Sequence, residues 1–299
     1  MFAVAFLYLC FTATMFLGSL LLTKNHYPLF VAGFRFFASG LMLLSLYFHH
    51  HKKIFWHYIP QLHRLDFYKY SFCLYTFSAI GYAWGMQYVD SVKACFVFVL
   101  APFITALLLY VLEGHVLTQK KLYGLLIGFA SVSAIILQSD HGVKSSADIS
   151  YEIAGYVVFA LATIAFAYGW ILNKRMHVTV HVPSGLLTGA ALFVGGSTTL
   201  VFWLCFENKA ICSMQVTDDF WWLLLLFAMI TGISYNLYSA LLKRYSATFV
   251  SFASFLEPAF GLVYGAIFLA KPISYLALCS LLGLGSGLYL FYQEELRLQ

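Results

Sequence analysis

Runs of about 20 apolar residues recur along the whole chain, and they restrict its fold more than any other sequence feature. A helix needs about 20 mostly apolar residues to cross the hydrocarbon core of a bilayer. The runs lack the sustained alternation of apolar and polar residues that is typical of transmembrane β-barrels. The sequence therefore predicts an all-α membrane protein with ten transmembrane helices. We expect these helices at residues 3–22, 28–48, 70–89, 94–112, 122–138, 153–172, 184–205, 220–241, 247–270 and 273–292.

Charged side chains are scarce in this chain. They make up 10% of its 299 residues, whereas a soluble domain carries charge on about 25%. Aromatic side chains make up 19%, so large apolar and amphipathic groups stand where charge is missing. Such a surface could not remain in water, which excludes a water-soluble enzyme.

Lysine and arginine are distributed unequally between alternate loops. With the N-terminus in the cytoplasm, eleven of the 17 basic residues fall in cytoplasmic segments and five in outer loops. Cytoplasmic loops of membrane proteins carry the excess of Lys and Arg, so both termini are predicted to be cytoplasmic. We expect a multi-pass protein of the bacterial inner (plasma) membrane, with the lipid bilayer as a partner. The net charge of +5 follows mostly from this topology and gives no reason to expect nucleic-acid binding.

The two halves of the chain resemble each other at an offset of 156 residues. Residues 90–103 align with residues 246–259, so that Pro102 coincides with Pro258. Because each half holds five predicted helices, an odd number, the second half must enter the membrane in the opposite orientation. Inverted-topology repeats are typical of secondary transporters, which bind their substrates near the midplane. The predicted domains are two five-helix repeats, a linking loop and a cytoplasmic tail, at residues 1–138, 153–292, 139–152 and 293–299 respectively.

Three short motifs that involve prolines lie within the predicted helices. The fourth helix contains Ala101-Pro102, the ninth contains Glu257-Pro258, and the second has Arg35 after a proline. Together with the ten-helix layout, these motifs resemble the EamA type of the drug/metabolite transporter superfamily. The resemblance covers nearly the whole chain and implies a secondary carrier of amino acids or other metabolites. It also implies a cavity lined by helices one, three, four, six, eight and nine.

One position departs from that family's pattern in both halves. An acidic residue commonly follows each of these prolines by thirteen positions in the family, but here His115 and Lys271 stand there. The nearby Glu113 is displaced by two residues. The role that the family gives to this acid is therefore open in this chain.

Two ionisable residues lie deep inside predicted spans. Glu257 is the only such acid, and an ionisable group at this depth needs a partner or a wet cavity. It is predicted either to bind a proton or a positively charged substrate, or to pack as a carboxyl group between helices. Arg35 is the only base within a span. It either binds a substrate carboxylate through two hydrogen bonds, or it has a structural role. In that role its charged end reaches the membrane interface or binds carbonyl groups between helices.

Further polar and aromatic residues are candidates for lining the cavity. Amides within an apolar span need hydrogen-bond partners, and aromatic rings stack on flat substrates. Many aromatic residues also pack in the core or face lipid, and periodicity does not show which face points inward. The candidates drawn from the spans are Trp84, Gln87, Tyr168, Asn173, Tyr235 and Asn236. The candidates placed on cavity helices by the family layout are Tyr8, Phe96, Phe98 and Phe252.

The loop between residues 49 and 69 contains five histidines among four cationic residues. A metal site there would need acids or cysteines at ligand spacing, which the loop lacks. Anchoring to an anionic leaflet is therefore the favoured interpretation, and we expect no metal and no cofactor. Pairs of glycines four residues apart indicate close helix packing; they stand at 81/85, 124/128, 185/189 and 261/265.

These features favour a secondary transporter of a small metabolite. One charge of each sign among many aromatic rings suits an amino-acid-like substrate that carries a base or a ring. Within the family that the chain resembles, the branch that moves S-adenosylmethionine, or exchanges it for S-adenosylhomocysteine, meets this description. Export of amino acids or other metabolites is the alternative. An intramembrane enzyme acting on lipid-linked groups would need paired acids or a His/Asp constellation that the spans lack, and a scaffold protein would need neither Glu257 nor Arg35.

Overall fold

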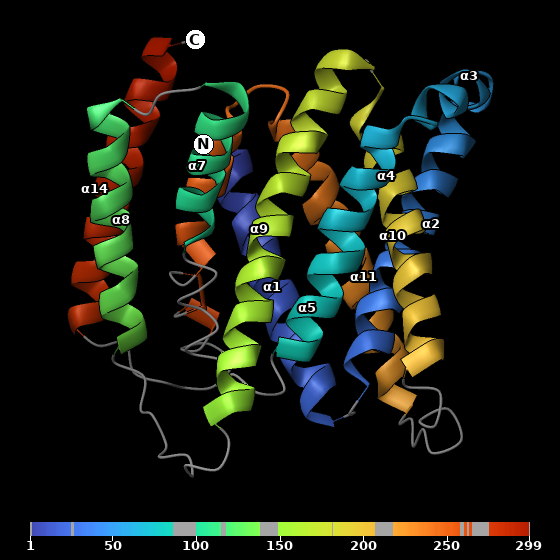
Figure 1. Ribbon diagram of the computed structural model, residues 1–299, viewed down its shortest axis with the longest axis horizontal. Coiled ribbons are helices and arrows are strands. Elements are labelled where there is room, and N and C mark those ends of the chain that lie inside the picture. The colour runs from blue at the N-terminus through green and yellow to red at the C-terminus, as the bar shows by residue number, and fades with distance from the viewer. Residues whose placement is uncertain are drawn as a thin grey trace.

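The computed structural model describes residues 2–24, 27–85, 100–114, 118–137, 149–180, 182–206, 218–257, 260–261, 263–264 and 275–298. Every regular element within these ranges is a helix, which confirms the all-α class. The helices stand side by side as a bundle, and α3 (Lys52–Leu62) and the C-terminus lie at the same end of it (Figure 1). We call this end the α3 end.

In the first half, α1, α2 and α8 agree with the predicted spans to within three residues, whereas the third helix begins at Leu65 and not at residue 70. Pro28 begins α2, where its fixed φ angle suits the first turn of a helix. Residues 65–85 form one continuous helix whose middle is a π-helical turn. In chain order the elements are α1 (Phe2–Lys24), α2 (Pro28–His50), α3, α4 (Leu65–Ser71), the π-turn η1 (Phe72–Phe77), α5 (Ser78–Gly85), α7 (Ala101–Glu113) and α8 (Gln119–Leu137).

The second half contains longer helices and one short irregular segment. Ser246 caps the N-terminus of α12 by accepting a hydrogen bond from the backbone N–H of Phe249. A 3₁₀ turn, η4, follows α12 directly. The elements are α9 (Ile149–Thr179), α10 (Ser184–Phe206), α11 (Asp218–Leu241), α12 (Ala247–Phe252), η4 (Ala253–Phe255) and α14 (Tyr275–Leu298).

Two helices of the second half extend about six residues beyond their predicted ends. The spans were expected to end at residues 172 and 292, but α9 continues to Thr179 and α14 to Leu298. The prediction stopped at the first charged residues, because charge is costly in lipid. In α9 these residues continue the helix because they have partners: the Lys174 ammonium donates to the Tyr245 carbonyl at 2.9 Å, and Arg175 pairs with Glu113 at 2.8 Å.

Several helices have the length and apolar composition of membrane spans. Within the described residues these are Pro28–His50, Ile153–Thr179, Ser184–Phe206 and Asp219–Leu241. Two shorter apolar stretches are Phe2–Gly18 and Ala101–Glu113. A helical membrane fold is therefore shown, whereas the number of ten spans and their inverted order stay predictions.

Glycines bring particular helix pairs into close contact, as expected for small residues in membrane helices. A Cβ atom on Gly40 of α2 would overlap backbone atoms of Phe193 on α10, and one on Gly196 of α10 would overlap Phe37. At the other side of the bundle in Figure 1, α8 packs on α14 with Gly124 against the Gly287 carbonyl. One of these pairs includes α2, which also lines the central cavity.

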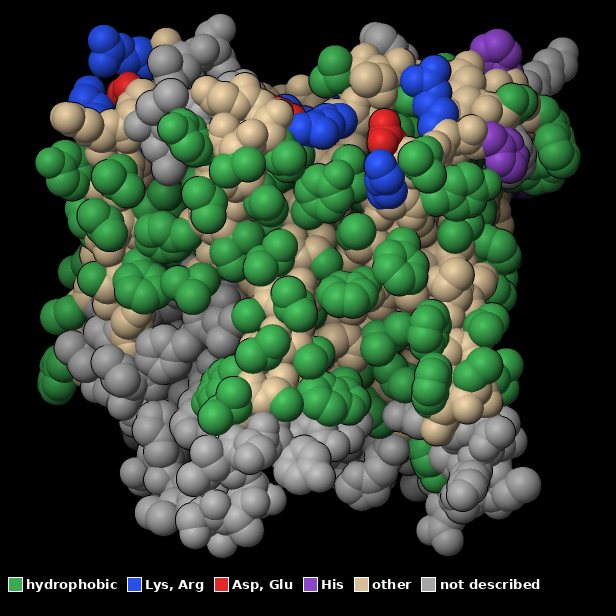
Figure 2. Space-filling view, viewed as in Figure 1, with side chains coloured by type: hydrophobic (Ala, Val, Ile, Leu, Met, Phe, Trp, Pro, Cys, Tyr) green, Lys and Arg blue, Asp and Glu red, His purple; other side chains and the backbone are tan. Residues whose placement is uncertain are grey.

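The surface has the distribution of side chains that a bilayer requires. Figure 2 shows hydrophobic side chains across the middle of the visible face, and the Lys, Arg, Asp, Glu and His side chains visible on this face gather along the α3 end. Exposed apolar residues such as Leu107, Val157 and Trp222 would be unfavourable in water but match hydrocarbon. The apolar band across this face matches the hydrocarbon core of a bilayer.

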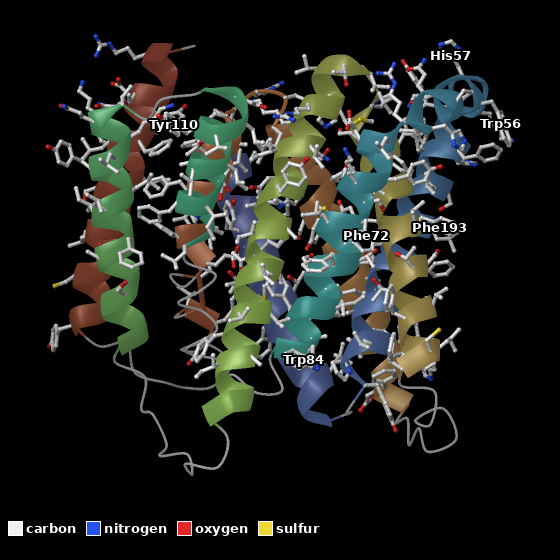
Figure 3. The ribbon with its side chains drawn as sticks, in the orientation of Figure 1. Trp56, His57, Phe72, Trp84, Tyr110 and Phe193 are labelled. Atoms are coloured by element: carbon white, nitrogen blue, oxygen red, sulfur yellow. The ribbon has the colours of Figure 1, made fainter. Side chains whose placement is uncertain are left out.

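The histidine-rich loop folds into α3 at the edge of the bundle. Trp56 and His57 lie on this helix (Figure 3), and Trp56 is 66% exposed. No group of three or more His, Cys, Asp or Glu residues in the described part of the chain is placed to hold a metal ion. An exposed amphipathic helix with basic residues suits the membrane interface, so the anchoring role stays a prediction with a physical basis.

Candidate functional site

A small central cavity lies among the helices of both halves. Its volume is about 50 Å³, which holds a few water molecules at most. Pockets for drug-sized ligands measure roughly 300–1,000 Å³, so a metabolite enters only if the helices move apart. The cavity is lined by Tyr8, Phe11, Thr14, Met15, Arg35, Phe36, Ser78, Ala79, Tyr82, Ala101, Phe166, Tyr235, Tyr238, Ser251, Ser254 and Glu257.

Arg35 presents a positive charge to this cavity from α2. Its guanidinium carbon lies 4.4 Å from the centre of the Phe36 ring and 4.8 Å from that of Phe227. These cation–π contacts hold the flat group in place without neutralising its charge. The Nε atom is buried and makes no hydrogen bond with any described residue. The guanidinium is therefore positioned but retains donors for an anionic group.

Glu257 presents a carboxyl group to the same cavity, from the residues that follow η4. Its backbone carbonyl accepts a hydrogen bond from the Thr12 hydroxyl at 3.4 Å, which links it to α1. The carboxyl group forms no ion pair with a described residue, Arg35 included. An arginine and a carboxyl group that face one cavity without pairing suit a ligand that brings a carboxylate for the one and a cationic group for the other.

Aromatic rings pack around the cavity residues of α11 and α1. The Trp170 ring stacks on Tyr238, with 3.6 Å between centroids and an angle of 16°, and also lies parallel to Tyr235 at 5.6 Å. The Tyr8 hydroxyl donates a hydrogen bond to the backbone carbonyl of Val250, which joins α1 to α12. Such rings supply flat apolar faces on which a heterocycle can stack.

The predicted site residues fall into three groups. Tyr8, Arg35, Tyr235 and Glu257 line the cavity. Trp84, Tyr168, Asn173, Asn236 and Phe252 do not line it. Gln87, Phe96 and Phe98 lie outside the described residues.

The second group occupies four different environments. Trp84 lies near the end of α5 (Figure 3) and is 36% exposed. Phe252 packs in the core against Phe255 and Phe291, and Tyr168 packs against the same core from α9. Asn236 lines an apolar groove between α1, α2 and α11. Asn173 is fully buried and bonds other polar residues.

Sequence reasoning missed several residues of the cavity. Tyr238 stands three residues after Tyr235 on α11, so helical periodicity places both on one face. This spacing was a usable signal. Tyr82, Phe36 and Phe166 carry no such signal, because aromatic residues occur on every face of these helices.

The displaced acid near the end of the fourth helix has a structural partner. Glu113 is the last residue of α7, and its Oε1 accepts a hydrogen bond from Arg175 Nε at 2.8 Å. Gly114 ends the helix with a φ of +69°, a left-handed conformation that suits glycine. His115 and Lys271 lie outside the described residues.

The profile of the EamA-like transporter family matches residues 1–137 and 153–293, which is nearly the whole chain. The chain belongs to the EamA-like transporter family. Membership agrees with the resemblance inferred from the proline motifs, and the two matched segments agree with two repeats. Because the members of this family are transporters, the chain is a transporter and not an enzyme. It is accordingly an integral membrane protein.

Characterised relatives of this EamA-like chain come from two bacterial species. A protein of Chlamydia muridarum (strain MoPn / Nigg), named S-adenosylmethionine/S-adenosylhomocysteine transporter, is 25% identical over 280 residues, covering 90% of this chain and 84% of that protein. The equally named protein of Chlamydia trachomatis serovar L2 is 24% identical over 279 residues, covering 90% of this chain and 82% of that protein. Both similarities span nearly the full chains.

One protein whose crystal structure has been solved has the same fold as this chain. It covers 99% of this chain and 97% of its own, with a TM-score of 0.80 and 14% sequence identity. At this identity the similarity shows the fold alone.

Proposed function

We propose that this chain is a secondary transporter that moves S-adenosylmethionine by alternating access, in exchange for S-adenosylhomocysteine. The observation that carries the proposal is that Arg35 and Glu257 line one cavity among aromatic rings without pairing with each other. S-Adenosylmethionine has a carboxylate, two cationic groups (an ammonium and a sulfonium) and an adenine ring. Each of these groups has a complementary partner in the cavity.

The charge and shape of each substrate group indicate which cavity residue binds it. Arg35 binds the carboxylate through its forked donors, and Glu257 binds the ammonium or the sulfonium. Tyr235, Tyr238 or Tyr8 supplies a face for the adenine ring. The names of the chlamydial relatives support this substrate. Transport of an amino acid or another metabolite remains the second candidate, because Arg35 and Glu257 would equally bind any zwitterion.

The membrane arrangement belongs to the same proposal. Ten helices form two inverted repeats at residues 1–138 and 153–292, joined by 139–152 and followed by a tail at 293–299. Alternating access then arises because the two repeats rock about the site between them. The gathering of charged residues at the α3 end (Figure 2) supports a cytoplasmic location for that end, in the inner membrane of a bacterium.

Counterflow in proteoliposomes tests the proposal. Vesicles loaded with unlabelled S-adenosylmethionine and diluted into a trace of labelled compound should accumulate label, and S-adenosylhomocysteine inside should support the same uptake. Empty liposomes and vesicles loaded with methionine alone serve as controls. Counterflow of aromatic or other amino acids without any adenosyl compound would overturn the substrate assignment, while leaving the transporter class intact.

A further inference from the structure

A chain of buried hydrogen bonds lies between the cavity and the α3 end. Asn173 Nδ2 donates to the Tyr70 hydroxyl at 2.7 Å, which bonds the Tyr75 hydroxyl at 2.9 Å. On its other side, Asn173 Oδ1 accepts from the Ser239 hydroxyl at 3.2 Å, and Ser239 lies 2.8 Å from His177 Nε2. With a proton on His177 Nε2, the Ser239 hydroxyl accepts from His177 and donates to Asn173.

This network crosses three helices that belong to different parts of the bundle. Tyr70 is on α4 and Tyr75 on η1, Asn173 is on α9, and Ser239 is on α11. Tyr70, Tyr75, Asn173 and Ser239 are all fully buried. Polar groups bonded across helices in such a dry region strongly favour one arrangement of those helices.

The π-helical turn explains how the two tyrosines reach each other. Residues five apart in an α-helix point about 140° away from each other. The wider turn of η1, marked by a bond from Ser78 N–H to the Cys73 carbonyl, reduces this angle and allows the hydroxyls of Tyr70 and Tyr75 to meet. Phe72 marks the start of this turn in Figure 3. Turns of this kind are frequent at functional sites.

The position of the network relative to the cavity defines its role. Asn173 stands seven residues after Phe166, a cavity residue on the same helix, and therefore roughly 10 Å nearer to the α3 end at 1.5 Å per residue. The Tyr75 ring lies 5.3 Å from that of Tyr235, which lines the cavity. The network thus contacts a cavity residue at Tyr75 and lies between the cavity and the α3 end.

A second layer of contacts lies further along α9. Lys174 donates to the Tyr245 carbonyl between α11 and α12, and Arg175 pairs with Glu113 of α7. Consecutive residues of α9 therefore hold α4, α11 and α7 together. The Arg175–Glu113 pair is partly exposed and contributes little by itself, so the buried amide is the stronger link.

We propose that Asn173 is a positioning residue that keeps the α3 end of the cavity closed, by bonding Tyr70 and Ser239 across α4, α9 and α11. Alternating access requires these bonds to break each time the cavity opens to that end. The proposal rests on transport by this chain but not on the identity of its substrate.

Labelling of a reporter cysteine tests the proposal without any substrate. In a cysteine-free background, Ser78→Cys places a thiol in the cavity, and Trp56→Cys in a separate sample marks which vesicles present the α3 end outward. A membrane-impermeant maleimide should label Ser78→Cys slowly from the α3 end. With Asn173→Ala added, labelling from that end should become roughly tenfold faster, because two buried hydrogen bonds no longer favour the closed arrangement.

Two further variants distinguish closure from general loosening. Tyr70→Phe removes one hydroxyl without creating a cavity and should give a smaller increase. Asn236→Ala is the matched control, since this amide lies on α11 outside the network and its Oδ1 bonds no described residue; it should leave labelling unchanged. The proposal is overturned if Asn173→Ala and Tyr70→Phe, both monodisperse on gel filtration, label as slowly as the parent. It is equally overturned if Asn236→Ala accelerates labelling as much as Asn173→Ala.

Discussion

Glu257→Gln is expected to lower counterflow of S-adenosylmethionine roughly 10- to 100-fold, which corresponds to the about 1.5–3 kcal/mol that a hydrogen bond to a charged group contributes. Glutamine keeps the size and the hydrogen-bonding shape of the side chain but removes the negative charge. The carboxyl group lines the cavity and has no ion pair with a described residue, so its loss removes no structural salt bridge. The protein should therefore remain folded, as judged by gel filtration and thermal unfolding in detergent.

The comparison of two substrates shows which cation Glu257 binds. If it meets the sulfonium, Glu257→Gln lowers transport of S-adenosylmethionine more than that of S-adenosylhomocysteine, which lacks that charge. If it meets the ammonium, both fall equally. The control is Glu294→Gln, a buried acid on α14 that pairs with Lys120 at 3.7 Å and Arg297 at 3.8 Å and does not line the cavity. Wild-type counterflow in a folded Glu257→Gln protein would exclude a role for this carboxylate.

Arg35→Lys has the second large effect that we expect, although it conserves the charge. An ammonium group cannot fill the space between Phe36 and Phe227 as a flat guanidinium does, and it lacks the forked donors that match a carboxylate. Counterflow of S-adenosylmethionine should fall about tenfold or more, in line with the loss of one charge-assisted bidentate contact. The exposed Arg64→Lys is the control and should transport normally.

A substrate without its carboxylate separates binding from structure. The wild-type protein should transport decarboxylated S-adenosylmethionine much less well than the intact compound. In Arg35→Lys this preference should shrink, because the group that recognises the carboxylate is altered. An unchanged preference, with both compounds transported equally less well, would show that Arg35 only supports the packing of α2.

The sequence predicted those site residues whose type is rare within the membrane spans. Charge is rare inside the spans, so Glu257 and Arg35 could be singled out, and the structure places both at one cavity. The long apolar runs likewise predicted a helical membrane protein, and the family match confirms the class of transporter. The offset between the halves predicted the repeat that the two matched segments show.

The remaining site residues depend on which helix face points inward. Tyr235 and Asn236 are adjacent and were predicted together, yet they point about 100° apart; Tyr235 lines the cavity and Asn236 the groove on the membrane side. Both faces of α11 are apolar, so periodicity could not separate them. Asn173 was predicted for the cavity because a buried amide needs partners, and it finds them in Tyr70 and Ser239 instead.

A structure determined by electron cryomicroscopy with S-adenosylmethionine bound tests most directly whether Arg35 and Glu257 form the substrate site. We expect the cavity to be wider than its present volume of about 50 Å³, with the ligand carboxylate at Arg35, a cationic group at Glu257 and the adenine ring against a tyrosine. Density for the ligand in the groove beside Asn236, or in the cavity without contact to Arg35 and Glu257, would exclude the proposed substrate site.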